Sequence, residues 1–346
     1  MTSTTTETTA QLQYIEKGGA FKIVQVPKPT LAPGEVLIRQ RVAALNLVDV
    51  KQRDLGLMIP SWPTVLGIEG AGVVEAVGSE VRDLQPGDEV AGLEGGGAHD
   101  VAWGGAFQEC VAVPATLLAK KPKNISLVEA ASLPVGFITA VCGIVYSLKI
   151  PLPFLHGLST KGEAPSSVLV LGGSSVTGAA VIQLLRKAYP ALPILATSSP
   201  KHNARLYDLG ATSVVDYKSP SVVTDIKAAS PGAAGVDVIF DCVSAGASQT
   251  DISDVFDSAG SKRYAAVVTS VTVPVPEGVT KLDVGGWNIV DLQGGMQLIS
   301  SLTKLVEEGT YRVPLPVRVV GHGLEELPKV LDEVKTVSGE KVVVTL

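Results

Sequence analysis

The stretch Val168-Leu-Val-Leu-Gly-Gly-Ser-Ser-Val-Thr-Gly178, followed by Ala-Ala-Val-Ile-Gln-Leu-Leu-Arg186, decides the fold. An apolar run, a glycine turn and an apolar helical pattern follow one another, which is typical of a buried strand leading into a helix. The unpaired N–H groups at such a helix start bind a diphosphate. We therefore predict a dinucleotide site in which Ser175 takes the middle position of a G-x-G-x-x-G pattern. Its residues are Gly172, Gly173, Ser174, Ser175, Val176 and Thr177.

A second apolar run, Pro193-Ile-Leu-Ala-Thr197, ends about 20 residues after the glycines, where a dinucleotide fold usually places an acidic residue for the ribose. This chain has Ser198, Ser199 and Lys201 there. Because hydroxyl groups and an ammonium bind a 2′-phosphate that an acid would repel, the sequence favours NADPH over NADH. The alternative is that Ser-Ser-Pro only starts a helix, for which these residues are also typical.

Composition excludes several classes of protein. A chain of 346 residues suggests two lobes, and 46% hydrophobic residues can fill their cores. A net charge of −6 without a basic cluster argues against nucleic acid. Residues 1–10 lack the basic and apolar regions of a signal peptide, so we expect a cytoplasmic protein. The segment 130–148 is apolar enough for a membrane span, but Pro134 and small residues interrupt it and favour a buried helix.

The pattern of apolar residues changes along the chain. Short β-branched runs with Pro-Gly and Gly-Asp turns fill residues 10–113 and predict an antiparallel, barrel-like lobe. From Val168 strands and helices alternate, which predicts a parallel, doubly wound sheet. A strand over 341–346 is expected to return to the first lobe. The remaining expected strands are 168–171, 194–197, 213–216, 236–241 and 264–269, and the expected helices are 176–187, 201–209, 294–308 and 324–335.

Four further motifs carry a resemblance that covers the chain from about Tyr14 to Leu346. They are Pro63-Thr-Val-Leu-Gly-Ile-Glu-Gly-Ala-Gly-Val73, Leu84-Gln-Pro-Gly-Asp-Glu-Val90, Gly105-Ala-Phe-Gln-Glu109 and Gly235-Val-Asp-Val-Ile-Phe-Asp241. With them the chain resembles the medium-chain dehydrogenase/reductase superfamily. The resemblance implies an α/β protein with a GroES-like β-barrel catalytic lobe and a Rossmann doubly wound parallel sheet. The expected domains are 1–134 (catalytic lobe, first part), 135–290 (NADP-binding Rossmann lobe) and 291–346 (return to the catalytic lobe).

The departures from the family pattern concern zinc. Zinc alcohol dehydrogenases of this superfamily carry a zinc-binding His where this chain has Ile68, and a Cys where it has Asn46. A catalytic zinc needs about three protein ligands of N, S or O type, so we expect no metal. Glu69 is then expected to be a buried structural carboxylate that accepts hydrogen bonds from backbone N–H groups.

Within the superfamily the chain resembles the zinc-free quinone and enoyl reductases, above all the fungal trans-acting enoyl reductases. The similar segments are Asn46-Leu-Val-Asp-Val-Lys51, Gly172-Gly-Ser-Ser-Val-Thr177, Ser199-Pro-Lys-His202 and Asp216-Tyr217. This resemblance implies NADPH as cofactor and assigns Asn46 and Tyr217 to its binding, beside Lys201. Val243 and Ser244 follow a strand of the parallel sheet, so we expect them to contact the cofactor as well.

Reduction of an activated double bond needs a hydride, a donor to the developing enolate oxygen and a proton. We expect that donor to be Lys51 or a hydroxyl of the cofactor, although Lys51 is alternatively a solvated lysine or a cofactor clamp. Asp49 is expected to orient Lys51 or the ribose rather than to act as a base. Mitochondrial-type enoyl reductases of this superfamily place a tyrosine as proton donor shortly after this segment, but residues 51–60 contain none. The resemblance therefore leaves protonation by water or by a donor elsewhere in the chain.

The resulting prediction is an NADPH-dependent, zinc-free reductase of an enone or enoyl group, such as a polyketide-derived or other secondary metabolite. The substrate is a small molecule, free or bound to a carrier protein, and the protein is a monomer or homodimer without nucleic-acid or membrane partners. The alternatives are an NADPH:quinone reductase and a non-catalytic NADP-binding partner protein.

Overall fold

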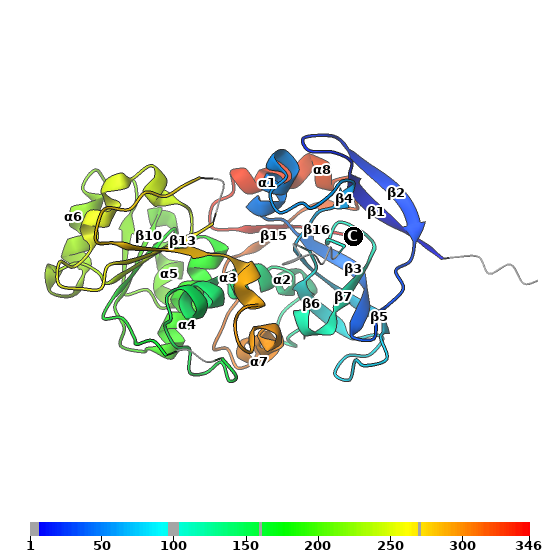
Figure 1. The fold of residues 1–346 in the computed structure, drawn as a ribbon, viewed down its shortest axis with the longest axis horizontal. Coiled ribbons are helices and arrows are strands. Elements are labelled where there is room, and N and C mark those ends of the chain that lie inside the picture. Colours follow the sequence, from blue (N-terminus) through cyan, green and yellow to red (C-terminus); the bar gives the residue numbers. More distant parts are fainter. Residues whose placement is uncertain (1–6, 96–103, 159–160, 269–270) are drawn as a thin grey trace, which may run out of the picture. The chain divides into compact units, whose positions relative to one another are not determined.

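The computed structural model describes residues 7–95, 104–158, 161–268 and 271–346 (Figure 1). The chain folds into two units, one formed by Met1–Val135 with Met296–Leu346 and the other by Gly136–Gly295. The first unit is discontinuous because the C-terminal residues rejoin it. Strand β16 (Lys341–Thr345) pairs with β3 (Glu35–Ala44) of the same unit, which is the return that the sequence predicts.

The first unit is built from two mainly antiparallel sheets. The larger has the order β15-β16-β3-β5-β6-β8, with β7 also paired to β3, and the smaller has the order β2-β1-β4. Only β15 and β16 run parallel to each other among these pairs. This is the antiparallel lobe that the sequence predicts. Its other strands are β1 (Thr8–Tyr14), β2 (Phe21–Pro27), β4 (Thr64–Val65), β5 (Glu69–Val77), β6 (Glu89–Leu93), β7 (Cys110–Pro114), β8 (Leu118–Lys120) and β15 (Val317–His322).

Helices of the first unit are short. They are α1 (Leu47–Leu55), α2 (Leu127–Ala130), α7 (Ser301–Glu307) and α8 (Leu327–Val330). Two predicted helices were too long. The helix expected over 294–308 begins only at Ser301, because Gly294 has a φ of +78° and interrupts helical geometry. The helix expected over 324–335 is α8 followed by a 3₁₀ segment, Leu331–Lys335, because Pro328 fits only in a first helical turn.

The second unit is a doubly wound parallel sheet with the order β11-β10-β9-β12-β13-β14, as predicted. The strand order reverses beside β9, so ligands are expected at the carboxyl ends of β9 and β12. Strand β12 begins at Val238, because Val236 forms only an isolated bridge to Phe256. The strands are β9 (Val168–Leu171), β10 (Ile194–Ser198), β11 (Ser213–Asp216), β12 (Val238–Asp241), β13 (Arg263–Val267) and β14 (Thr280–Val284).

The helices that belong with this sheet are α3 (Pro134–Val141), α4 (Val176–Ala188), α5 (Asn203–Leu209) and α6 (Val222–Ala229). The helix predicted over 201–209 starts instead as a 3₁₀ turn, Pro200–His202, and becomes α-helical at Asn203. Among the described residues, one helical segment, Leu127–Ser147, is long and apolar enough to cross a membrane, and 83% of its apolar 18-residue window is buried inside the protein.

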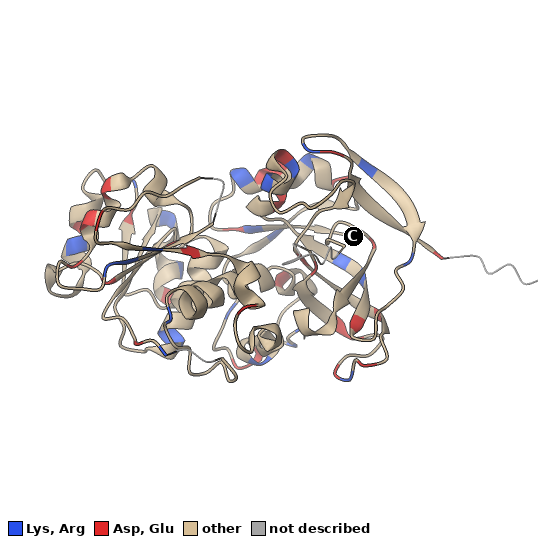
Figure 2. Cartoon of the chain, in the orientation of Figure 1, with Lys and Arg blue, Asp and Glu red and all other residues tan. Residues whose placement is uncertain are grey.

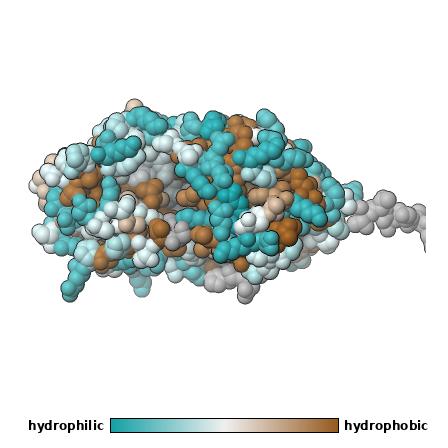
Figure 3. All heavy atoms as spheres, turned by 90° about the horizontal axis from the view of Figure 1, so that it is seen from above, coloured by the Kyte–Doolittle hydropathy of each residue, from teal (hydrophilic) through white to brown (hydrophobic). Residues whose placement is uncertain are grey.

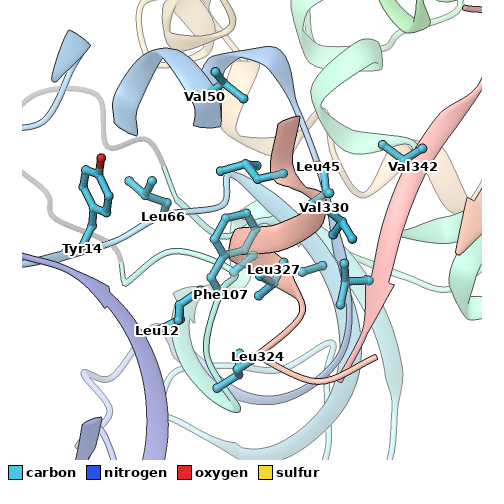
Figure 4. Close-up of a cluster of buried hydrophobic side chains, with 14 of the residues drawn as sticks. Leu12, Tyr14, Leu45, Val50, Leu66, Phe107, Leu324, Leu327, Val330 and Val342 are labelled. Atoms are coloured by element: carbon cyan, nitrogen blue, oxygen red, sulfur yellow. The ribbon is translucent and has the colours of Figure 1, made fainter. Parts of the chain in front are cut away.

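Each unit has its own apolar core. In the first unit, Leu45 and Val342 lie in one buried cluster with residues of α1 and α8 (Figure 4). In the second unit, Leu169, Ile239 and Tyr264 join the strands to the helices around them. The surface seen in Figure 3 has small apolar patches separated by polar side chains. Burial of each large apolar side chain contributes about 1.5–3 kcal/mol, so these cores hold the loops at the strand ends in place.

Candidate functional site

The predicted site residues divide between the two units. Asn46, Asp49 and Lys51 belong to the first unit, and the glycine turn and the other predicted cofactor residues belong to the second. Each group is therefore described within its own unit.

The glycine turn follows β9 in the second unit. Gly172 has a φ of +75°, and a Cβ there would lie 2.5 Å from Cγ1 of Val243, so only glycine fits. The N–H of Gly173 donates to the carbonyl of Thr197 at 2.9 Å, which ties the turn to β10. The loops after β9 and β12 thus meet at the point where the strand order reverses.

Ser175 caps helix α4. Its hydroxyl accepts from the N–H of Gly178 at 3.0 Å and donates to the carbonyl of Gly172 at 2.8 Å. The hydroxyl hydrogen is therefore already used within the turn. Ser175, at the position of the middle glycine of the pattern, therefore acts as the cap of the helix. Its hydroxyl hydrogen is not available to a phosphate.

Three backbone N–H groups of this turn remain available. Within the described residues the N–H groups of Ser174, Val176 and Thr177 have no acceptor, and the last two belong to the first turn of α4. The first N–H groups of a helix have no partner inside the helix and carry its positive dipole end. This arrangement is suited to a diphosphate.

The end of β10 carries hydroxyl groups instead of an acid. Ser198 is the last, buried residue of the strand, and Ser199 precedes the 3₁₀ turn that contains the exposed Lys201. Tyr217 follows β11 and is 41% exposed, and its carbonyl accepts a hydrogen bond from Gln249. These positions lie at the carboxyl ends of the neighbouring strands β10 and β11.

The loop after β12 is organised by Asp241, a residue that sequence reasoning missed. Its fully buried carboxylate accepts from the N–H groups of Val243, Ala245 and Gly246 at 3.0–3.1 Å. It also accepts from the hydroxyl of Tyr264 at 2.7 Å, and burial raises the pKa of that hydroxyl. The loop places Val243 at the surface, 52% exposed, and holds Ser244 in a left-handed conformation.

In the first unit, Asn46 lies between β3 and α1 and is the N-cap of α1. Asp49 is fully buried, and its carboxylate accepts from the N–H of Asn46 at 2.7 Å, so it caps the start of its own helix. Burial raises the pKa of Asp49 to about 7, partly offset by the N–H of Asn46 and the charge of Lys341. The contacts of the described residues join Asp49 to Asn46 rather than to Lys51.

Glu69 is as buried as expected but has a partner that was not expected. Its Oε2 accepts from the N–H of Val135 at 2.8 Å, as a structural carboxylate would. Its Oε1 lies 2.6 Å from the ammonium of Lys341, which is only 6% exposed. Lys341 also donates to Oδ1 of Asn46 at 2.6 Å. The sequence offered no signal for this pair, because a lysine at the start of a terminal strand is usually solvated.

A second buried carboxylic acid lies near this pair. Glu94 is fully buried and accepts a hydrogen bond from the side-chain amide of Gln40. Burial raises the pKa of Glu94 well above its usual range, and the charge of Glu69 raises it further. Burial thus disfavours the charged form of Glu94, whereas Glu69 lies in an ion pair with Lys341.

Lys51 lies on the partly exposed side of α1. Leu47 and Leu55, one helical turn before and after it, are 47% and 50% exposed. Among the ion pairs of the described residues none includes Lys51, whereas Arg53 on the same helix pairs with Asp332 at 2.7 Å. Figure 2 shows charges of both signs on α1. Burial lowers the pKa of Lys51, and an ammonium flanked by apolar side chains is a donor for a developing negative charge.

The cysteines Cys110, Cys142 and Cys242 form no disulfide. Burial raises the pKa of all three thiols. Since the thiolate is the nucleophile, none of them is suited to covalent catalysis.

Known proteins resemble the chain over nearly its whole length. A family model described as an alcohol dehydrogenase GroES-like domain matches residues 32–123, and one described as a zinc-binding dehydrogenase matches residues 209–338. The trans-enoyl reductase caaB of Aspergillus niger is 31% identical and covers 92% of this chain and 91% of its own. The dehydrogenase orsE of Emericella nidulans is also 31% identical, covering 98% and 99%. The CurK enoyl reductase structure shares the fold, with a TM-score of 0.79 at 24% identity over 98% and 99% of the chains.

Proposed function

The chain belongs to the medium-chain dehydrogenase/reductase superfamily of oxidoreductases, and on this basis we propose that it is an NADPH-dependent, zinc-free reductase of an activated carbon–carbon double bond. The observation that carries the proposal is the buried ammonium of Lys341 between Asn46 and Glu69.

The name of the second family model raises the question of a catalytic zinc, and the residues do not fit one. Ile68 has no ligand atom, and the oxygens of Asn46 and Glu69 already contact the Lys341 ammonium at 2.6 Å. A divalent cation beside that ammonium would be repelled in a buried environment. Among the described residues no group of three His, Cys, Asp or Glu side chains could hold a metal ion.

The second unit fits a nicotinamide dinucleotide. The free N–H groups of Val176 and Thr177 are suited to its diphosphate. The hydroxyl groups after β10 and the exposed Lys201 support the choice of NADPH, because they complement a 2′-phosphate. When bound, the nicotinamide supplies a hydride.

The first unit supplies the polar groups for the substrate. Reduction of an enone or enoyl group places negative charge on the carbonyl oxygen, and the Lys51 ammonium is the donor that we assign to it. The exposed Leu47 and Leu55 beside it suit an apolar substrate. Relatives named trans-enoyl reductases support a substrate of this class, which we propose to be a polyketide-like chain, free or on a carrier protein.

The test begins with the purified, metal-analysed protein. Fluorescence titration compares NADPH with NADH, and NADPH oxidation is then followed with a panel of enones and quinones. The expected result is tighter binding of NADPH, saturation of the carbon–carbon double bond and substoichiometric zinc. Hydroquinone as the only product would establish the quinone reductase instead, and NADPH binding without turnover would establish a non-catalytic partner protein. Stoichiometric zinc would overturn the metal-free assignment.

A further inference from the structure

The ends of β3 and β16 are held in register at the candidate site. The N–H of Leu45 donates to the carbonyl of Val342 at 3.0 Å, and both side chains are anchored in the same buried cluster (Figure 4). Asn46 follows Leu45 directly, and Lys341, the first residue of β16, directly precedes Val342. The fold therefore brings a lysine from the end of the chain onto the side chain of Asn46, 295 residues away in sequence.

The hydrogen bonds of the Asn46 amide can be counted completely for the described residues. Nδ2 donates to Oε1 of Glu69 at 3.1 Å and to the carbonyl of Ala44 at 3.3 Å, which uses both of its hydrogens. Oδ1 accepts from Lys341 at 2.6 Å and also faces the backbone N–H of Asp49 in the capping box of α1. Both hydrogens of the amide are used, so any further hydrogen bond to this side chain has to be accepted by Oδ1.

The ion pair fixes this orientation of the amide. An ammonium only donates hydrogen bonds and an ionised carboxylate only accepts them. If the amide turned over, its NH₂ group would face the Lys341 ammonium and its oxygen would face the Glu69 carboxylate. Both contacts would then be repulsive in a buried environment, where such contacts are strongly unfavourable.

We propose that Lys341 is a positioning residue that, together with Glu69, holds Asn46 as a pure hydrogen-bond acceptor toward the bound ligand. The inference rests on the proposed function and deepens it. Asn46 then receives a donor group, a hydroxyl or an N–H, from the cofactor or the substrate. It does not stabilise an enolate oxygen, which needs a donor, and that role stays with another group.

The first set of variants separates positioning from folding. Lys341→Met removes the donor to Asn46. The double variant Glu69→Gln/Lys341→Met also removes this donor but leaves no unpaired charge, whereas Lys341→Arg keeps a cationic donor. Lys329→Met is the matched control, because Lys329 is an exposed lysine that pairs with Glu326 on the surface. Thermal unfolding of each variant is measured beside NADPH affinity, kcat and KM.

We expect the folded double variant to lose about 10- to 100-fold in kcat/KM, since a small misplacement of a site residue has effects of that size. Lys341→Arg should recover most of this loss, and Lys329→Met should match the wild type. A folded double variant with wild-type NADPH affinity, kcat and KM would overturn the inference, because the pair would then be only structural.

The second set of variants tests the polarity of residue 46 and does not depend on removing Lys341. Asn46→Asp/Glu69→Gln keeps Lys341 paired and leaves residue 46 with acceptors alone, whereas Asn46→Ala removes the acceptor. The inference predicts that the double variant binds its ligand more tightly than Asn46→Ala. Equal loss in both variants would contradict it.

The source of the donor group is read from the same measurements. A weaker NADPH affinity in Asn46→Ala identifies the cofactor, and a higher KM for the enone at saturating NADPH identifies the substrate; both results support the inference. A wild-type protein that binds NADPH but reduces no enone or quinone overturns the proposed function, while the NADPH titrations still decide the role of Lys341. A wild type without NADPH affinity overturns both.

Discussion

The ammonium of Lys341 lies 2.6 Å from a carboxylate oxygen of Glu69, although the two residues are 272 positions apart in the chain. The pair links the C-terminal strand to the start of β5, and both side chains are almost completely removed from water. Removal of one partner of a buried ion pair leaves the other charge uncompensated.

Lys341→Met is therefore expected to lower the free energy of unfolding by about 3–5 kcal/mol. Lys329→Met, at an exposed ion pair, should change it by less than about 1 kcal/mol. Urea denaturation measures both. Equal stability of the two variants would contradict a stabilising buried ion pair between Lys341 and Glu69.

Asp49→Asn tests the raised pKa of Asp49. A carboxyl group with a pKa of about 7 in the folded state keeps a proton that the unfolded chain releases near pH 4. The folded state thus binds more protons between these values, so this group makes the wild type less stable as pH rises from about 4 to 7. The stability of Asp49→Asn relative to the wild type should increase over that window by up to about 1.4 kcal/mol per pH unit.

Asp54→Asn is the control, because the pKa of Asp54 is shifted in the opposite direction to that of Asp49. The hydrogen bond from Arg53 lowers the pKa of Asp54, so the ionised carboxylate stabilises the folded protein above the pKa that Asp54 has in the unfolded chain. This stabilisation is lost as the pH falls through the pKa of Asp54 in the folded protein. The difference from the wild type should therefore be constant near neutral pH and disappear only below about pH 4. Unfolding curves at a series of pH values separate the two variants, and the same pH dependence in both would refute the assignment for Asp49.

Lys51→Ala is expected to lower kcat by about 100- to 1000-fold, as removal of one oxyanion donor does in other enzymes. The affinity for NADPH should stay unchanged, because Lys51 is assigned to the substrate. Lys51→Arg keeps the charge and should retain more activity. If the NADPH affinity falls and kcat does not, Lys51 is a cofactor clamp.

Lys201→Ala is expected to weaken NADPH binding by about tenfold or more, the equivalent of one charge-assisted hydrogen bond of about 1.5 kcal/mol. NADH binding should be unaffected, since NADH has no 2′-phosphate. Fluorescence titration with both cofactors measures the change. A parallel loss for NADH and NADPH would favour a role of Lys201 in its 3₁₀ turn alone.

Tyr264→Phe tests the loop after β12. The variant removes the 2.7 Å hydrogen bond to Asp241 and should lower stability by about 1–3 kcal/mol, because a buried carboxylate oxygen loses a partner. NADPH affinity should fall as well, since Val243 and Ser244 are held by that carboxylate. A variant with lower stability and unchanged NADPH affinity would remove this loop from the cofactor site.

Local sequence predicted most of the second unit. Strands 168–171 and 213–216 match the structure residue for residue, because apolar runs flanked by turn residues mark buried strands. Helix ends were predicted less well where a proline or a glycine acts, as at Pro328 and Gly294. Proline cannot continue the interior of a helix and glycine readily leaves helical geometry, so apolar spacing alone overestimates the helix length at both places.

The candidate site was predicted only where it is local. The glycine turn follows from adjacent residues, but the cap formed by Ser175 needs the geometry of the turn. The partner of Glu69 could not be predicted at all, because it depends on the register between β3 and β16 rather than on any motif. Asp241 is the last residue of the motif 235–241, but its role depends on the fold of the loop that follows it.

The central claim is hydride transfer from NADPH to a carbon–carbon double bond without zinc, and product analysis tests it most directly. The metal-analysed protein is incubated with an enone and NADPH that carries deuterium at the transferable position. The account predicts a saturated ketone with deuterium on its β-carbon and no dependence on added zinc or chelator. An unsaturated alcohol with deuterium on the carbonyl carbon, or activity that chelation abolishes and zinc restores, would contradict it.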